Sequence, residues 1–86
     1  MREIIFLPQA VLDLEEISEP LLSEIRSRIG LLIEFPYLGP VLEEEYEGFR
    51  CLNVGIVRVY YHVASEGNIS ILYIRHQKRQ FPPIKE

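Results

Sequence analysis

The spacing of apolar residues changes once along this 86-residue chain, and that change constrains the fold more than any other feature. Between residues 8 and 35 the apolar side chains recur every three or four positions, as on one face of a helix. From residue 49 to residue 75 they alternate with polar ones, as in half-buried strands. The sequence therefore predicts helices followed by a sheet, within a single domain spanning residues 1–86.

The N-terminal part predicts a strand and two helices. Residues 2–7 form a short run rich in Ile and Phe, typical of a strand. Pro8 suits the first turn of a helix, and Pro20 interrupts the helical spacing and starts a second helix. Phe35-Pro36 ends that helix. Two successive helices with a tight break between them predict a helical hairpin.

Three further strands are expected at residues 49–54, 56–64 and 69–75, with a turn cluster at 65–68. The predicted fold is α+β, in the order β-α-α-β-β-β, with the helical hairpin packed on one face of a mostly antiparallel sheet. The predicted core includes Ile5, Leu14, Ile25, Ile29, Val57 and Val59.

Arg58, in the strand expected at residues 56–64, is a candidate functional residue. Alternation puts Val57 and Val59 on one face and Arg58 on the other, beside Tyr60 and His62. A guanidinium in the middle of an open sheet face suits a phosphate or a partner's carboxylate. The alternative is a solvated arginine stacked on a tyrosine.

The last strand runs into the densest basic cluster of the chain, formed by Arg75, His76, Lys78 and Arg79. A histidine beside cations fits acid–base chemistry on RNA, whose own 2′-hydroxyl is the nucleophile, so no metal or other cofactor is expected. The alternatives are a solvated tail and an electrostatic handle for an acidic partner.

Charge is distributed unevenly. Residues 1–47 carry a net charge of -8 and residues 48–86 a net charge of +4, which permits one anion-binding face. The alternative is that the helices collect glutamates for solubility. Cys51 is the single cysteine, and neither an apolar run of membrane-spanning length nor a secretory signal occurs, so the expected compartment is the cytoplasm, with no membrane partner.

Short motifs along nearly the whole chain, taken in their order, resemble the RelE/ParE family of toxins. The first half carries Pro8-Gln9-Ala10, Asp13-Leu14 with Ile17, Leu32-Ile33-Glu34-Phe35-Pro36 and Leu38-Gly39. The second half carries Gly48-Phe49-Arg50-Cys51-Leu52-Asn53-Val54-Gly55, Val57-Arg58-Val59-Tyr60-Tyr61 and Ile74-Arg75-His76 with basic residues after it. This resemblance implies the same β-α-α-β-β-β fold.

The resemblance also implies a function and partners. RelE-like members are endoribonucleases that enter the ribosomal A site and cleave mRNA, and a cognate antitoxin is the expected partner. By position, Arg58 matches the sheet arginine that contacts the scissile phosphate, and His76 a proton-transferring group. The implied RNA-binding or charge-stabilising residues are Arg50, Arg75, Lys78 and Arg79.

Two departures keep other functions open. The second strand has only Arg50 where the ribonucleases have a lysine pair, and Phe81 stands where they have a tyrosine. The ParE branch of the family inhibits DNA gyrase instead of cleaving RNA. The alternatives are therefore a gyrase inhibitor and a degenerate, non-catalytic toxin that acts only as a binding module.

Overall fold

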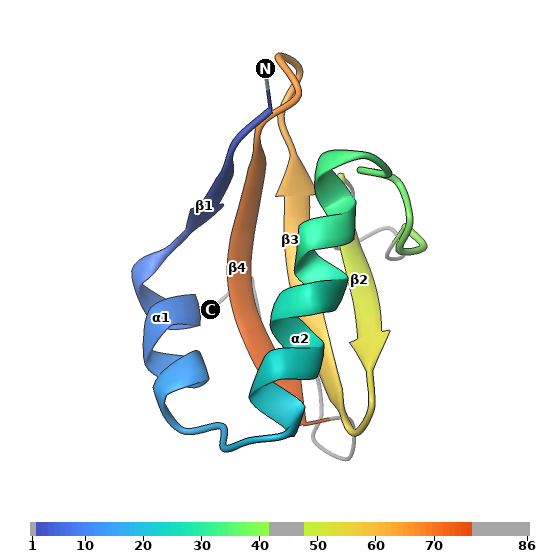
Figure 1. The fold of residues 1–86 in the computed structure, drawn as a ribbon. Helices are drawn as coiled ribbons and strands as arrows, with labels where there is room; N and C mark the ends of the chain where they lie inside the picture. The colour runs from blue at the N-terminus through green and yellow to red at the C-terminus, as the bar shows by residue number, and fades with distance from the viewer. Residues whose placement is uncertain (1, 42–47, 77–86) are drawn as a thin grey trace.

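A computed structural model describes residues 2–41 and 48–76 of the chain (Figure 1). The predicted order of elements is confirmed. The elements are β1 (Ile4–Phe6), α1 (Pro8–Glu15), α2 (Leu21–Gly30), the short 3-10 helix η1 (Leu31–Ile33), β2 (Phe49–Val54), β3 (Val57–Val63) and β4 (Ile69–His76).

The four strands form one mixed sheet in the order β1-β4-β3-β2. Strands β2, β3 and β4 make an antiparallel meander, and β1 pairs in parallel with β4. Figure 1 shows α2 lying across one sheet face and α1 beside β4, beyond the end of β1. The predicted α+β fold, with two helices on a mostly antiparallel sheet, is confirmed.

The core lies between α2 and the sheet. Ile25 and Ile29 of α2 are buried in one cluster with Val57 and Val59 of β3, and the half-buried Leu14 packs against that cluster. These five residues confirm the core predicted from the sequence.

The prediction for Ile5 is wrong, because this side chain is 42% exposed. Strand β1 lies at the edge of the sheet, and its alternation turns Ile4 and Phe6 toward the core and Ile5 away from it. A strand that is apolar at every position does not reveal which of its faces is buried.

The second helix is shorter than predicted. It ends at Gly30, and the chain continues as the 3-10 turn η1 before reaching Phe35-Pro36. Glycine lowers helix stability, and the Phe35 amide donates to the Leu31 carbonyl to close the turn. The apolar spacing continues through this turn, which explains why the sequence predicted one longer helix.

Candidate functional site

Two arginines lie side by side on the sheet face that points away from the helical core, called here the outer face. Arg58 of β3 is directly opposite Arg75 of β4, and Tyr60 is opposite Tyr73. The two tyrosine rings are 5.0 Å apart between centroids, and Arg75 Cζ lies 4.9 Å from the centre of the Tyr73 ring. We call these four residues the arginine–tyrosine cluster.

The cluster combines positive charge with an aromatic surface. Both arginines and Tyr73 are half-buried, whereas Tyr60 is buried and packs its ring beside that of Tyr73. Like charges directly opposite each other on a sheet repel, so an anion between them would relieve that repulsion. Guanidinium groups bind phosphate through several N–H donors at once.

Cys51 lies beside the cluster, opposite Tyr60 on the neighbouring strand, and is buried as the sequence predicts. Burial raises the pKa of its thiol, while the nearby charge of Arg58 acts in the opposite direction. A thiol with a raised pKa is a poor nucleophile, so Cys51 is assigned to packing.

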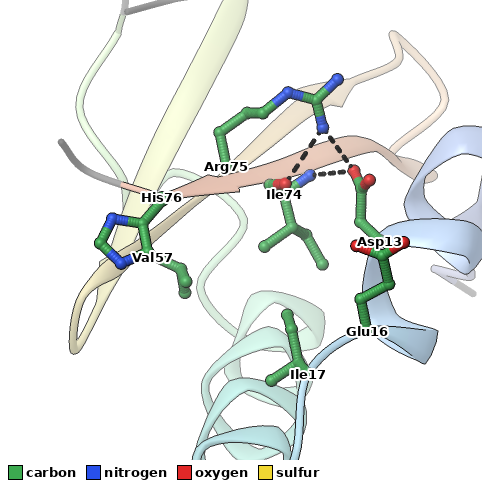
Figure 2. A pocket seen from close by; sticks show the side chains of 7 residues that line it. All are labelled: Asp13, Glu16, Ile17, Val57, Ile74, Arg75 and His76. Carbon is green, nitrogen blue, oxygen red and sulfur yellow. Dashed lines mark hydrogen bonds and ion pairs between the residues drawn. The ribbon is translucent and has the colours of Figure 1, made fainter. Parts of the chain in front are cut away.

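Asp13 of α1 joins this face to the helices (Figure 2). Its Oδ2 accepts hydrogen bonds from the Ile74 amide at 2.8 Å and from Arg75 Nη1 at 2.7 Å. Its Oδ1 accepts a bond from Gln9 Nε2 at 2.9 Å. The sequence alone does not reveal these contacts of Asp13, because only the fold brings α1 against the end of β4.

His76 lies on the other side of the sheet from Arg58. It is directly opposite Val57, whose side chain belongs to the helical core, whereas Arg58 is opposite Arg75. His76 borders a cleft of about 270 Å³ that Glu16 and other residues near the end of α1 also line (Figure 2). The described geometry therefore brings Arg58 together with Arg75 and does not bring it together with His76.

Arg50 has a local role in this structure. It lies opposite the buried Tyr61, on the face that carries the helical core, and its Nη1 donates to the Gly39 carbonyl at 2.7 Å. Its guanidinium also stacks on Tyr37, with Cζ 4.7 Å from the ring centre. Lys78 and Arg79 lie outside the described residues.

Within residues 2–41 and 48–76, no three histidine, cysteine or acidic side chains are grouped closely enough to hold a metal ion. In the same part of the chain, no helix has both the length and the apolar character needed to cross a membrane.

Comparison with known proteins identifies the family. The model of the family described as the ParE toxin of the type II toxin–antitoxin system parDE matches residues 4–81. The chain belongs to the RelE/ParE family of toxins. No curated protein matches this toxin at a significant level.

Solved structures from both branches of the family resemble this toxin. The RelBE2 toxin–antitoxin complex of Mycobacterium tuberculosis matches with a TM-score of 0.78 and 25% identity, over 86% of this chain and 95% of that one. The intact RelBE complex of E. coli matches with a TM-score of 0.76 and 11% identity, over 90% and 98%. The ParDE system of P. aeruginosa matches with a TM-score of 0.71 and 19% identity, over 88% and 96%. The fold is thus common to RelE and ParE proteins, and the site residues have to distinguish their activities.

Proposed function

We propose that this toxin is a ribosome-dependent mRNA endoribonuclease that inhibits translation. The observation that supports this most directly is the pairing of Arg58 with Arg75 on the outer face, beside Tyr73. Two guanidinium groups with an adjacent aromatic ring suit a phosphate and its neighbouring base. Dependence on the ribosome rests on the resemblance to RelE proteins.

In the proposed reaction the RNA 2′-hydroxyl attacks the adjacent phosphorus, and the bond from phosphorus to the 5′-oxygen of the next nucleotide breaks. Negative charge grows on the non-bridging phosphate oxygens, where Arg58 and Arg75 stabilise it. Lys78 and Arg79 follow closely in sequence and add positive charge. RNA supplies the nucleophile, so the proposed reaction requires no metal ion.

His76 remains the proposed proton-transferring residue, because an imidazole can both donate and accept a proton and this one lines a cleft together with Arg75. Arg58 and His76 lie on opposite faces of the sheet, so Arg58 and Arg75 make the proposed phosphate contact and His76 does not. A His76→Gln variant tests proton transfer independently.

Gyrase inhibition is the second candidate function, and the match to the ParE family model favours it. Under this alternative the arginine–tyrosine cluster would contact the gyrase protein instead of RNA. Arginine and tyrosine are enriched in the energetically dominant parts of protein interfaces, so the same surface is compatible with that use.

A cognate antitoxin is the proposed protein partner. The similar structures from M. tuberculosis and E. coli are toxin–antitoxin complexes. The helical part of this chain is acidic and the rest is basic. We propose that the antitoxin binds across the surfaces of both parts and places acidic side chains near Arg58. Loss of antitoxin binding at high salt is the expected result, and salt-insensitive binding would contradict the electrostatic part.

The deciding experiment measures two activities of the same purified toxin: single-turnover cleavage of mRNA on programmed ribosomes and inhibition of gyrase supercoiling. Cleavage should occur, and Arg58→Ala should slow it by ~10²-fold, as loss of one transition-state contact commonly does. Arg26→Ala is the matched control, because Arg26 is exposed on α2.

Intact ribosome-bound mRNA together with blocked supercoiling would refute the nuclease proposal and support gyrase inhibition. A toxin without either activity that still binds its antitoxin would support the binding-module alternative.

A further inference from the structure

The carboxylate of Asp13 completes the edge of the sheet where β1 has ended. Strand β1 pairs with β4 only from Ile69 to Ile71, and the amide of Leu7 makes one more bond to the Ile71 carbonyl. Beyond that point the Ile74 amide donates to Asp13 at 2.8 Å. A side chain of α1 thus replaces the missing strand partner.

The same carboxylate oxygen holds Arg75. The distance from Asp13 Oδ2 to Arg75 Nη1 is 2.7 Å, and the two side chains are only 14% and 25% exposed. A charged hydrogen bond in such a partly buried position is stronger than an exposed surface pair, because solvent screens it less. Arg75 also lies over the Tyr73 ring, so its guanidinium is held from two sides.

Gln9 fixes the orientation of the carboxylate. It lies one helical turn before Asp13 and donates to Oδ1, which leaves Oδ2 directed at the end of β4. The three bonds connect helix α1, through Asp13, to an arginine of the outer face. Figure 2 draws the two bonds that join Asp13 to the Ile74 amide and to Arg75.

We propose that Asp13 is a positioning residue for Arg75, which it holds beside Arg58 so that both can contact one RNA phosphate. Its negative charge also offsets the repulsion between the two arginines. This inference rests on the proposed nuclease function, and it assigns Asp13 a role in the rate of cleavage that is separable from its role in folding.

The test is a double-mutant cycle on single-turnover cleavage of ribosome-bound mRNA at saturating toxin. Asp13→Asn keeps an oxygen acceptor for the Ile74 amide but removes the charge that holds Arg75, so cleavage should slow by about 10-fold. In an Arg75→Ala background the same change should have no further effect, because Asp13 acts through Arg75. Glu15→Gln is the matched control, since it removes an exposed charge of α1 and should leave the rate unchanged.

Gln9→Ala provides a second variant if Asp13→Asn folds poorly. It releases the carboxylate but keeps both its charge and its bond to Ile74, and it should slow cleavage by roughly 3-fold only when Arg75 is present. Thermal unfolding of every variant separates effects on rate from effects on stability.

An active wild-type toxin in which Asp13→Asn slows cleavage equally with and without Arg75 would overturn this inference and leave the nuclease function standing. Unchanged cleavage by both the Asp13 and the Gln9 variants would overturn it as well. A folded wild-type toxin that does not cleave RNA would overturn the nuclease function, and this inference with it.

Discussion

The hydroxyl of Tyr61 connects the sheet to the loop that follows η1, and its removal should destabilise the fold measurably. Tyr61 is fully buried, donates to the Pro36 carbonyl at 3.0 Å and accepts from the Gly39 amide at 2.9 Å. Tyr61→Phe removes one oxygen and both bonds and keeps the ring that packs in the core. The Pro36 carbonyl and the Gly39 amide then lose their partner in a buried place.

The size of the effect follows from that loss. Leaving a buried polar group unsatisfied costs roughly 1–3 kcal/mol, so the loss at two groups predicts a decrease in the free energy of unfolding of about 2–6 kcal/mol. Two neighbouring bonds, from Arg50 to the Gly39 carbonyl and from the Cys51 amide to the Pro40 carbonyl, keep the loop in place. The loop therefore cannot move outward to let water bind the Pro36 carbonyl and the Gly39 amide. The melting temperature should fall by roughly 10 °C or more for a domain of this size.

Urea and thermal unfolding of the purified toxin measure this decrease. The matched control is Tyr37→Phe, which removes the same atom from a side chain that is 64% exposed and should change stability by less than about 0.5 kcal/mol. Equal stability of Tyr61→Phe and the wild type would refute the reasoning, because it would mean that water or a loop rearrangement satisfies both groups at no cost.

Further predictions concern the core, the thiol, Arg50 and His76. Ile29→Ala should lower the free energy of unfolding by about 2–4 kcal/mol in urea unfolding, and a loss below 1 kcal/mol would contradict its place in the core. Burial raises the pKa of Cys51 in the folded state, so the folded protein holds the thiol proton more tightly than the unfolded chain does. The resulting stabilisation is fully present below the unfolded thiol pKa of roughly 8.5 and is lost as the pH rises through the folded pKa, so Cys51→Ala should flatten this alkaline decline in denaturant titrations. Arg50→Ala should lower the melting temperature without changing the salt dependence of RNA binding, and a slope reduced by about 1 would instead indicate a phosphate contact. His76→Gln should slow cleavage by ~10²–10⁴-fold if His76 transfers a proton, and an unchanged rate would exclude that role.

The sequence predicted those features that depend on local periodicity. The faces of β3 follow from strict alternation, so Val57 and Val59 were correctly placed in the core and Arg58 on the opposite face. The burial of α2 follows from helical spacing in the same way. Each of these predictions needs only the residues of one element, because a single element has one apolar face to bury.

The contacts of Asp13 and Arg50 could not be predicted in this way, because their partners are distant in sequence. Asp13 contacts Arg75 across 62 positions, and Arg50 contacts Gly39 across 11 positions through an irregular loop. Hydrophobic periodicity carries no information about which polar side chains meet. The RNA-binding or charge-stabilising role of Arg50 therefore stays a prediction, and the structure adds that its guanidinium contacts loop carbonyls and the Tyr37 ring.

The separation of Arg58 from His76 has a specific cause, a bulge in β4. Tyr60 is opposite Tyr73, but the next residue of β3, Tyr61, is opposite Ile71, so Leu72 is an extra residue in β4. One extra residue exchanges the faces of all residues beyond it. Without the bulge, alternation from Ile69 and Ile71 would place residue 76 on the outer face.

Traces of that bulge are present in the sequence. The buried isoleucines of β4 are 69, 71 and 74, so the spacing changes from two to three within the strand. Strict alternation cannot bury all three, whereas an extra residue after Ile71 buries Ile74, turns Arg75 to the outer face and directs His76 to the opposite side. The pairing of Arg58 with Arg75 is therefore a consequence of burying Ile74. Deleting Leu72 would remove the extra residue and restore strict alternation, so Ile69, Ile71 and Ile74 would stay in the core and Arg75 would stay opposite Arg58. We therefore expect this variant to fold and to keep the arginine pair, and a variant that does not unfold cooperatively on heating would contradict the assignment of the bulge to Leu72.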